Sequence, residues 1–183
     1  MSTETINQQI PAGTWTVDPV HSSIHFAITH GGIATYRSGF DRYEVTLTGG
    51  EAAKLEGSVD IDSLEIDEPQ LKGHLMSPDF FDAERYPQVK FSSTELTVED
   101  DGSVRLAGDF ELHGETRRVE ATGRFGEVGE DLGGNPRLGL SLATAIDRRD
   151  WGVDWNAELP KGGNVLEYEV AINVELELVA QES

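Results

Sequence analysis

The segment from residue 166 to residue 178 alternates between apolar and polar side chains more regularly than any other part of the chain. Its apolar positions are Leu166, Tyr168, Val170, Ile172, Val174, Leu176 and Leu178, and the residues between them include Glu167, Glu169, Asn173, Glu175 and Glu177. Successive side chains of a β-strand point to opposite faces. The segment is therefore predicted to be a strand with one face toward an apolar interior and the other toward water.

The same two-residue period recurs along most of the chain. A short strand is predicted at 13–17, and long strands at 22–30, 39–48, 55–61, 89–98, 104–112, 119–125 and 138–146. With 166–178 this makes about eight long strands, and their mostly short connections favour antiparallel neighbours. An up-and-down barrel of that size leaves no open sheet edge and can hold one small ligand. We predict an all-β fold, an antiparallel eight-stranded β-barrel.

Two connections carry local turn signals. Gly31 and Gly32 end a strand, and residues 33–37 are predicted to form one helical turn. Gly114 and Glu115 separate two alternating segments, and glycine at the first central position favours a type II′ hairpin. Adjacent antiparallel strands are therefore predicted on either side of Gly114.

One long interruption, residues 62–88, separates the strands and is called the lid segment below. Acidic residues and Pro69 favour a helix start near residue 67, and Leu71, Leu75 and Met76 then share one side of that helix. A second helical piece, capped by Ser77 or Asp79, is predicted to carry Phe80 and Phe81. The short helical insertion is predicted to span about 67–82 and to cover the barrel.

Length and charge restrict the class of protein. The 183 residues fit one domain, predicted at 13–180 after a mobile tail at 1–12. Asp and Glu number 34 against 14 Lys and Arg, for a net charge of -20. This charge repels phosphate backbones and anionic headgroups, so we expect no nucleic-acid partner. A well-solvated surface is the ordinary explanation of such acidity.

The sequence also lacks the residues and segments that several kinds of site and several cellular locations require. The absence of cysteine excludes disulfides, thiolate zinc sites and cysteine nucleophiles. No run of about 18 apolar residues occurs, so stable membrane insertion is not expected. The first residues show neither the basic nor the apolar region of a signal peptide, which predicts a cytoplasmic location.

Catalytic and metal-binding patterns are weak. His21 and His25 would be about 13 Å apart in a strand, too far to share one ion. No Gly-x-Ser-x-Gly nucleophile motif is present. Asp147, Asp150 and Asp154 lie near two arginines and favour ion pairs at a barrel mouth. We therefore expect no metal, no required cofactor and no enzymatic activity.

Seven short motifs occur in an order that resembles the YceI-like family over residues 13–179. They are Trp15–Ser22, His74–Leu75, Ser77–Asp82, Tyr86–Pro87, Phe91–Ser93, Leu106–Phe110 and Arg148–Gly152. The resemblance implies a lipocalin-like barrel whose elongated apolar cavity holds a polyisoprenoid, such as a quinone tail or an isoprenoid lipid. Members of that family are often exported. This chain departs from the family pattern at Lys72 and Gly73, where a basic–acidic pair is usual, and at Trp151, where phenylalanine is usual.

Thirteen residues are predicted to contact such an apolar small-molecule ligand. They are Phe26, Ile28, Phe40, His74, Leu75, Met76, Phe80, Phe81, Phe91, Leu140, Trp151, Trp155 and Tyr168. A pocket of this kind is mostly apolar, with few polar groups for orientation. The alternatives are that these side chains only fill the barrel core, that the protein is an enzyme acting on a bound lipid, or that it is a ligand-free acidic interaction barrel. A homodimer is also left open by the exposed acids of the final strand.

Overall fold

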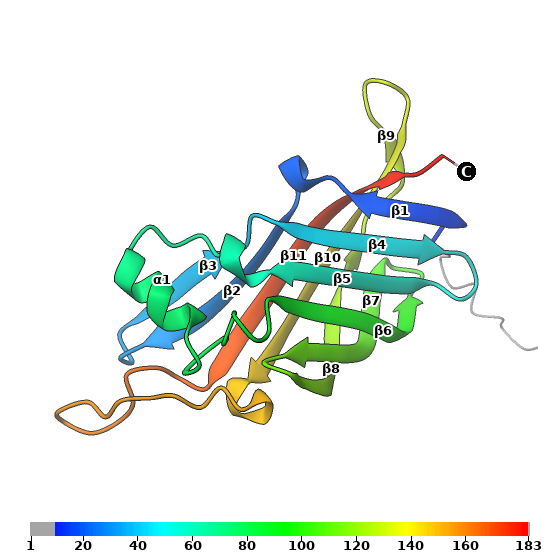
Figure 1. Ribbon diagram of the computed structural model, residues 1–183. Helices are drawn as coiled ribbons and strands as arrows, with labels where there is room; N and C mark the ends of the chain where they lie inside the picture. Colours follow the sequence, from blue (N-terminus) through cyan, green and yellow to red (C-terminus); the bar gives the residue numbers. More distant parts are fainter. Residues whose placement is uncertain (1–9, 183) are drawn as a thin grey trace, which may run out of the picture.

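Eleven antiparallel strands and one short helix make up the computed structural model, which describes residues 10–182 (Figure 1). The strands are β1 Gly13–Val17, β2 Ser23–His30, β3 Ala34–Gly39, β4 Tyr43–Gly49, β5 Lys54–Asp60, β6 Gln88–Val98, β7 Ser103–Leu112, β8 Glu115–Phe125, β9 Gly129–Glu130, β10 Pro136–Asp147 and β11 Glu169–Ala180. The helix α1 is Pro69–Met76, and the 3-10 turns are η1 Pro19–His21, η2 Ile61–Ser63 and η3 Arg148–Trp151.

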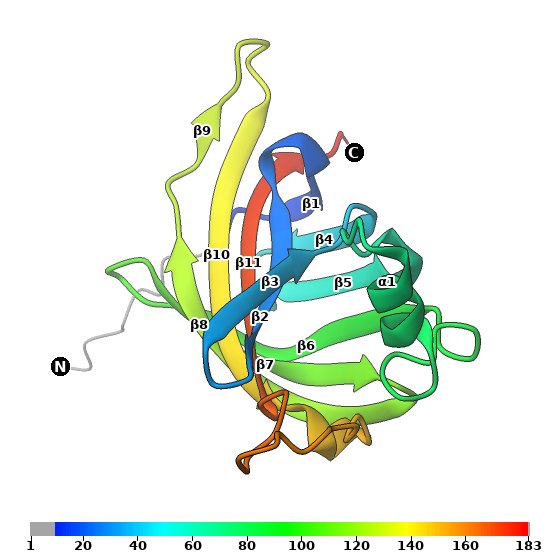
Figure 2. The ribbon, with the colours of Figure 1, turned by 90° about the vertical axis from the view of Figure 1, so that its left-hand side faces the viewer.

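Eight of these strands close into a ring. The neighbours run β1, β4, β5, β6, β7, β8, β10 and β11, and β11 pairs with β1 to complete the circuit. The longest ladder joins β10 to β11, from Arg137 opposite Val179 to Asp147 opposite Glu169. Figure 2 views the ring from its covered end. The predicted eight-stranded antiparallel barrel is confirmed.

The alternation of the final strand places its side chains as predicted. Leu176 and Leu178 are buried on the inner face of β11, whereas Asn173 and Glu175 between the inward positions are exposed. Only this orientation buries the apolar side chains of the strand and leaves its polar side chains in contact with water.

The ring is split at one end because two strands share one edge of β11. Residues 178–180 of β11 pair with β1, while residues 171–175 pair with β2. β2 continues into the hairpin with β3, and this hairpin diverges from β4. The lid segment bridges the resulting gap through the isolated pair of Phe40 and Leu64 and a bond from the Glu65 N–H to the Gly39 carbonyl of 2.9 Å.

The predicted helical turn at 33–37 is wrong, since these residues belong to the β2–β3 hairpin. Gly31 and Gly32 both have positive φ, +60° and +67°, and form its turn. The edge of β2 needs a hydrogen-bonding partner, and the local sequence cannot signal this need. The strand predicted from residue 39 consequently begins only at Tyr43.

The predicted adjacency of β7 and β8 is confirmed, but the turn type is wrong. Leu112 pairs with Glu115, so the two turn residues are His113 and Gly114, with φ of +55° and +76°. Two residues with positive φ form a type I′ turn, which matches the twist of the flanking strands.

In the lid segment, the predicted first helix is confirmed and the second is wrong. The Glu68 carboxylate accepts bonds from the N–H groups of Gln70 and Leu71, and Pro69 occupies the first turn of α1. Residues 77–86 form turns instead of a helix. The chain folds back on α1 there, because the N–H of Phe81 bonds to the carbonyl of Leu75 at 3.0 Å.

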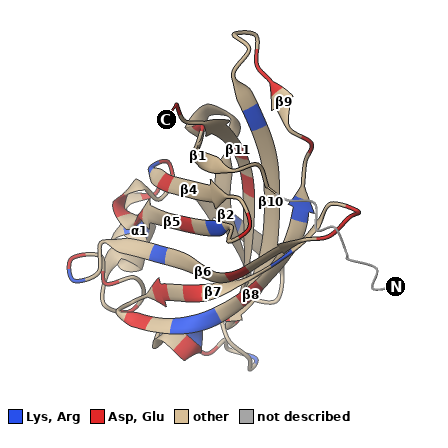
Figure 3. Ribbon diagram, turned by 90° about the vertical axis from the view of Figure 1, so that its right-hand side faces the viewer, with Lys and Arg blue, Asp and Glu red and all other residues tan. Residues whose placement is uncertain are grey.

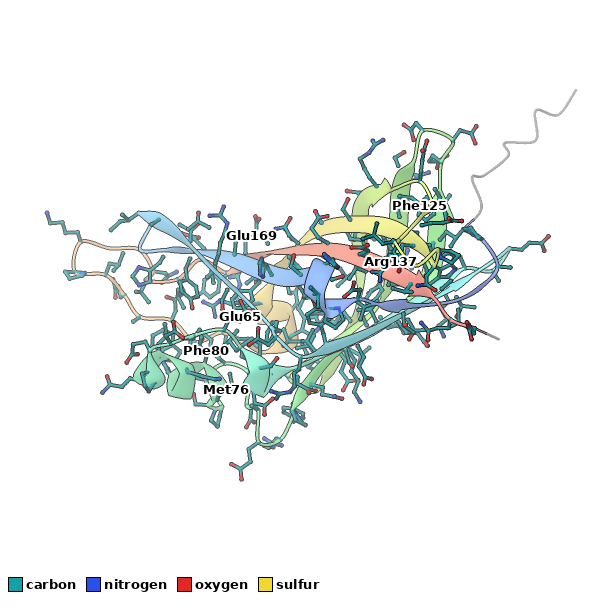
Figure 4. All side chains as sticks on the ribbon, turned by 90° about the horizontal axis from the view of Figure 1, so that it is seen from above. Glu65, Met76, Phe80, Phe125, Arg137 and Glu169 are labelled. Carbon is teal, nitrogen blue, oxygen red and sulfur yellow. The ribbon has the colours of Figure 1, made fainter. Side chains whose placement is uncertain are left out.

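A dry apolar core fills one end of the barrel, called the closed end. Its buried members are Ile10, Trp15, Val45, Leu47, Leu55, Val98, Val104, Leu106, Phe125, Leu138, Leu140, Leu142, Leu176 and Leu178. Figure 4 shows Phe125 at this end and Phe80 of the lid segment at the other. Ile10 is only 2% exposed, so packing begins before Gly13; residues 1–9 of the predicted tail lie outside the described residues.

Candidate functional site

An internal cavity of about 750 Å³ lies between the closed end and the lid segment. It is lined by inward residues of β2–β8, β10 and β11, by the lid segment, and by the β10–β11 loop, residues 152–168. Its lining is almost wholly apolar. The volume falls within the range of about 300–1,000 Å³ that is typical of small-molecule sites.

The cavity is elongated along the barrel. At its closed end it is bounded by Leu55, Leu106 and Leu176, and at its lid end by Trp155 and Leu166. Along β10 and into η3, the lining runs from Leu142 to Arg148, six residues on. At about 3.3 Å per residue this corresponds to roughly 20 Å. The shape suits one extended chain.

Aromatic contacts join the lid segment to the barrel wall. The rings of Phe40 and Phe81 meet edge to face, with their centroids 6.2 Å apart. The His74 ring lies edge to face with Trp155 of the β10–β11 loop at 4.7 Å, and with Phe80 at 5.0 Å. Such pairs stabilise by about 0.5–1.5 kcal/mol each beyond area burial. The lid segment is therefore held against the barrel wall by aromatic side chains.

Nine of the thirteen predicted contact residues line this cavity. They are Phe26, Ile28, Phe40, His74, Leu75, Phe80, Phe81, Phe91 and Trp155. Their contact with a ligand stays a prediction, but the structure brings them together from five strands and loops distant in sequence.

The other four predicted residues do not line the cavity. Met76 packs behind it with Phe40 and Leu64, and Leu140, 2% exposed, belongs to the closed-end core. Trp151 packs outside Phe110 and donates its indole N–H to the Phe110 carbonyl at 3.0 Å. The Tyr168 ring lies under the guanidinium groups of two arginines instead.

Most of the wall was not singled out from the sequence. The additional lining residues include Ile24, Val45, Leu55, Val59, Val89, Leu106, Phe110, Leu112, Val119, Ala121, Leu142, Ile146, Val153, Val165, Leu166, Val170, Ile172, Val174 and Leu176. The signal that could have found many of them is the two-residue period itself, since a cavity inside a barrel is lined mainly by the inward-facing residues of the strands around it.

Arg148 is the one buried charged side chain among the cavity-lining residues that the structure describes. It begins η3, directly after β10, and is 3% exposed. Its Nη1 donates to the Val153 carbonyl at 2.8 Å and its Nε to the Glu167 carbonyl at 3.2 Å. Burial lowers the pKa of the Arg148 guanidinium.

A separate charged cluster lies outside the cavity, on η1, β10 and β11. Asp18, His21 and Glu177 bring ligand-type atoms within 4.8 Å of one another. The Arg137 guanidinium lies among them, 2.6 Å from Asp18 and 2.9 Å from Asp131. Hydrogen bonds from His21 and Arg137 lower the pKa of Asp18 to about 2. These acids already have a cationic partner, so the geometry favours an ion-pair network over a metal site.

Charges on the outer surface follow the predicted pattern in part. Figure 3 shows acidic and basic residues distributed over the outer strands and loops. Of the three aspartates predicted to form ion pairs near the mouth, Asp147 pairs with Arg149 at 2.6 Å. None of the described helices is long and apolar enough to cross a membrane.

Comparison with known proteins places these features in context. A family model described as the YceI-like domain matches residues 15–178. A UPF0312 protein of Vibrio cholerae is 28% identical over 137 residues, covering 73% of this chain and 72% of that protein.

Two solved structures share the fold. BcnA of Burkholderia cenocepacia is similar with a TM-score of 0.74 and 18% identity, covering 90% of this chain and 99% of that one. A polyisoprenoid binding domain from Saccharophagus degradans has a TM-score of 0.66 and 14% identity, covering 91% and 98%. At these identities the likeness concerns the fold alone.

Proposed function

Because the chain belongs to the YceI-like domain family, we propose that its cavity binds one polyisoprenoid or similar long-chain amphiphile, such as a quinone or an isoprenoid lipid. The role would be transport, storage or sequestration. The single observation that carries this proposal is the elongated apolar cavity of about 750 Å³ inside the barrel. The polyisoprenoid binding domain of Saccharophagus degradans, which has the same fold, adds support.

Elementary energetics favour an apolar chain as the occupant. Each methylene group transferred from water into such a cavity contributes about 0.8 kcal/mol, before the costs of ordering and immobilisation. An apolar chain that fills most of the roughly 20 Å path can therefore gain enough free energy to bind with hardly any polar contacts. Affinity should rise with the length of the tail.

Two rival functions receive less support. An enzyme acting on a bound lipid needs a nucleophile or an acid–base pair facing the ligand. Among the described lining residues, no hydroxyl is hydrogen-bonded to a histidine or carboxylate; Thr144, for example, donates to the Glu120 carbonyl. A ligand-free interaction barrel would fill its interior with side chains, which the volume of the cavity argues against. We accordingly propose binding without catalysis and without a required cofactor.

The test is an organic extract of the purified protein, analysed by mass spectrometry, followed by titration with prenyl ligands. We expect a co-purifying apolar molecule and affinity that increases with tail length. Equal affinity for short and long tails, together with empty extracts, would refute the proposal. The homodimer stays a prediction, which light scattering tests; β11 is paired along both edges, so contact through it would use side chains alone.

A further inference from the structure

Arg148 has an unusual environment for a buried cation. Its side chain is 3% exposed, and its Nη2 has no hydrogen-bond partner among the described residues, although both other guanidinium nitrogens have one. An unpaired buried donor, above all on a charged group, is costly. Arg148 lines the cavity, so a ligand oxygen could supply the missing partner if the guanidinium, whose Nη2 is enclosed in the structure, turns toward it.

No carboxylate of the described residues forms an ion pair with Arg148. The carboxylate of its sequence neighbour Asp147 accepts hydrogen bonds from Arg149 instead, including one of 3.0 Å from Nε and one of 2.6 Å from Nη2. Among the described residues, the guanidinium of Arg148 donates hydrogen bonds to two carbonyl oxygens and lies over the face of Tyr168, whose centroid is 4.7 Å from its central carbon. These dipoles and the ring offset part of the charge, but none of them is an anion.

The position of Arg148 in the cavity matches the polarity of an amphiphile. The closed end is bounded by leucines, and Arg148 lies at the opposite end of the path along β10, near Trp155 and Leu166. An amphiphile with its tail toward the closed end would bring its headgroup to this arginine. The reverse orientation would place the headgroup against Leu106 and Leu176, whose side chains have no hydrogen-bond donor.

We propose that Arg148 binds an anionic oxygen of the ligand's headgroup, so that the cavity selects anionic amphiphiles over neutral ones of equal tail. This inference rests on the proposed function. The shared chemistry is an oxyanion, from either a phosphate or a carboxylate. Charge-assisted bonds to a guanidinium are stronger than bonds between neutral groups, and are strongest where water is excluded.

The test compares matched ligands that differ only in the headgroup. Farnesyl phosphate is titrated against farnesol, and hexadecanoate against hexadecanol, each by displacement of an apolar fluorophore. Wild type is expected to bind the phosphate or the carboxylate at least tenfold more tightly than its alcohol. A gain with both acids indicates oxyanion recognition in general, whereas a gain with one of them identifies the source.

Two variants locate the effect. Arg148→Met should lose the preference for the anion, measured as the ratio of the affinities for farnesyl phosphate and farnesol in the same variant. Arg149→Met is the matched control, because Arg149 also contacts Tyr168 but its side chain is 54% exposed, and the preference should survive. An Arg148→Met protein that retains the preference would overturn the inference.

A measurement on wild type keeps the inference testable if Arg148→Met does not fold. Arg148 is the only buried arginine of the described residues, so its guanidinium should give the most solvent-protected arginine side-chain signal in nitrogen-15 spectra. That signal should shift with farnesyl phosphate and not with farnesol; no shift with either anion would overturn the inference. Farnesol that binds without any anion preference refutes the role of Arg148 alone, whereas failure of every ligand to bind refutes the proposed function.

Discussion

Filling the deep part of the cavity should shorten the tail that the protein accepts. Ala121 of β8 is half-buried, lines the cavity, and lies opposite Leu106 of the closed-end core. A larger side chain at this position would enter the space where the end of a long tail is expected. Ala121→Phe therefore tests the direction and the depth of binding together.

The magnitude follows from the methylene groups that the new ring displaces. If only two are pushed out of the cavity, the loss is about 1.6 kcal/mol, at about 0.8 kcal/mol for each. Since about 1.4 kcal/mol is a factor of ten, affinity for a long tail should fall more than tenfold. A short tail that ends before Ala121 should lose less than about twofold, because it gives up no contact.

The assay is fluorophore displacement by geraniol and by geranylgeraniol, with the fold of each variant checked by circular dichroism. Ala145→Phe is the control, because Ala145 is exposed on β10 and does not line the cavity. This control should bind both ligands as wild type does. Equal losses for the two ligands in Ala121→Phe, or no loss for either, would refute a tail that extends to the closed end.

Three further perturbations have defined outcomes. Phe81→Asp should weaken binding of a prenyl quinone more than tenfold, because it places an unpaired carboxylate against the tail, whereas Glu175→Gln on the outer face should change little; a titration that finds Phe81→Asp fully competent would move the site elsewhere. Leu178→Ala removes a fully buried side chain of the closed-end core and should lower the free energy of unfolding by about 2–5 kcal/mol in urea, while a loss below about 1 kcal/mol would contradict tight packing there. The hydrogen bond to Asp18 raises the pKa of His21, so its stabilising effect is complete below the ordinary histidine pKa and is lost as the pH rises through the folded-state value. Thermal melts from pH 5 to 9 should show this decline in wild type and not in His21→Gln, and parallel curves for the two proteins would exclude the contribution.

Side-chain periodicity carried most of the fold prediction. The alternation in β11 defines an inward face without reference to any other strand, and it is realised in the structure. The β2–β3 hairpin was missed because residues 33–37 are too short to show a period, although β3 pairs with the preceding strand β2 across the glycine turn. Pairing with β2 decided the structure there.

The candidate site could be predicted in kind but not residue by residue. Leu140 and Leu142 share one face of β10, yet Leu140 lies in the solid core and Leu142 at the edge of the cavity. Periodicity identifies the inward face, whereas the distance to the opposite wall decides whether that face meets a side chain or a space. For the same reason the sequence could not place Trp151, which lies beyond the end of the strand where the period no longer applies.

The split of the ring at the lid end has a consequence for the rate of ligand exchange. At the closed end, each strand of the ring is paired with a neighbour on both sides, so opening there requires breaking many backbone hydrogen bonds at once. The junction between the β2–β3 hairpin and the lid segment is held by much less. It has one isolated bridge, a few backbone hydrogen bonds and the aromatic contact of Phe40 with Phe81. Local opening of such a junction needs far less free energy than global unfolding. The proposed ligand would therefore enter and leave on a timescale set by the opening of this junction, whereas the lifetime of the folded barrel is set by the ladders.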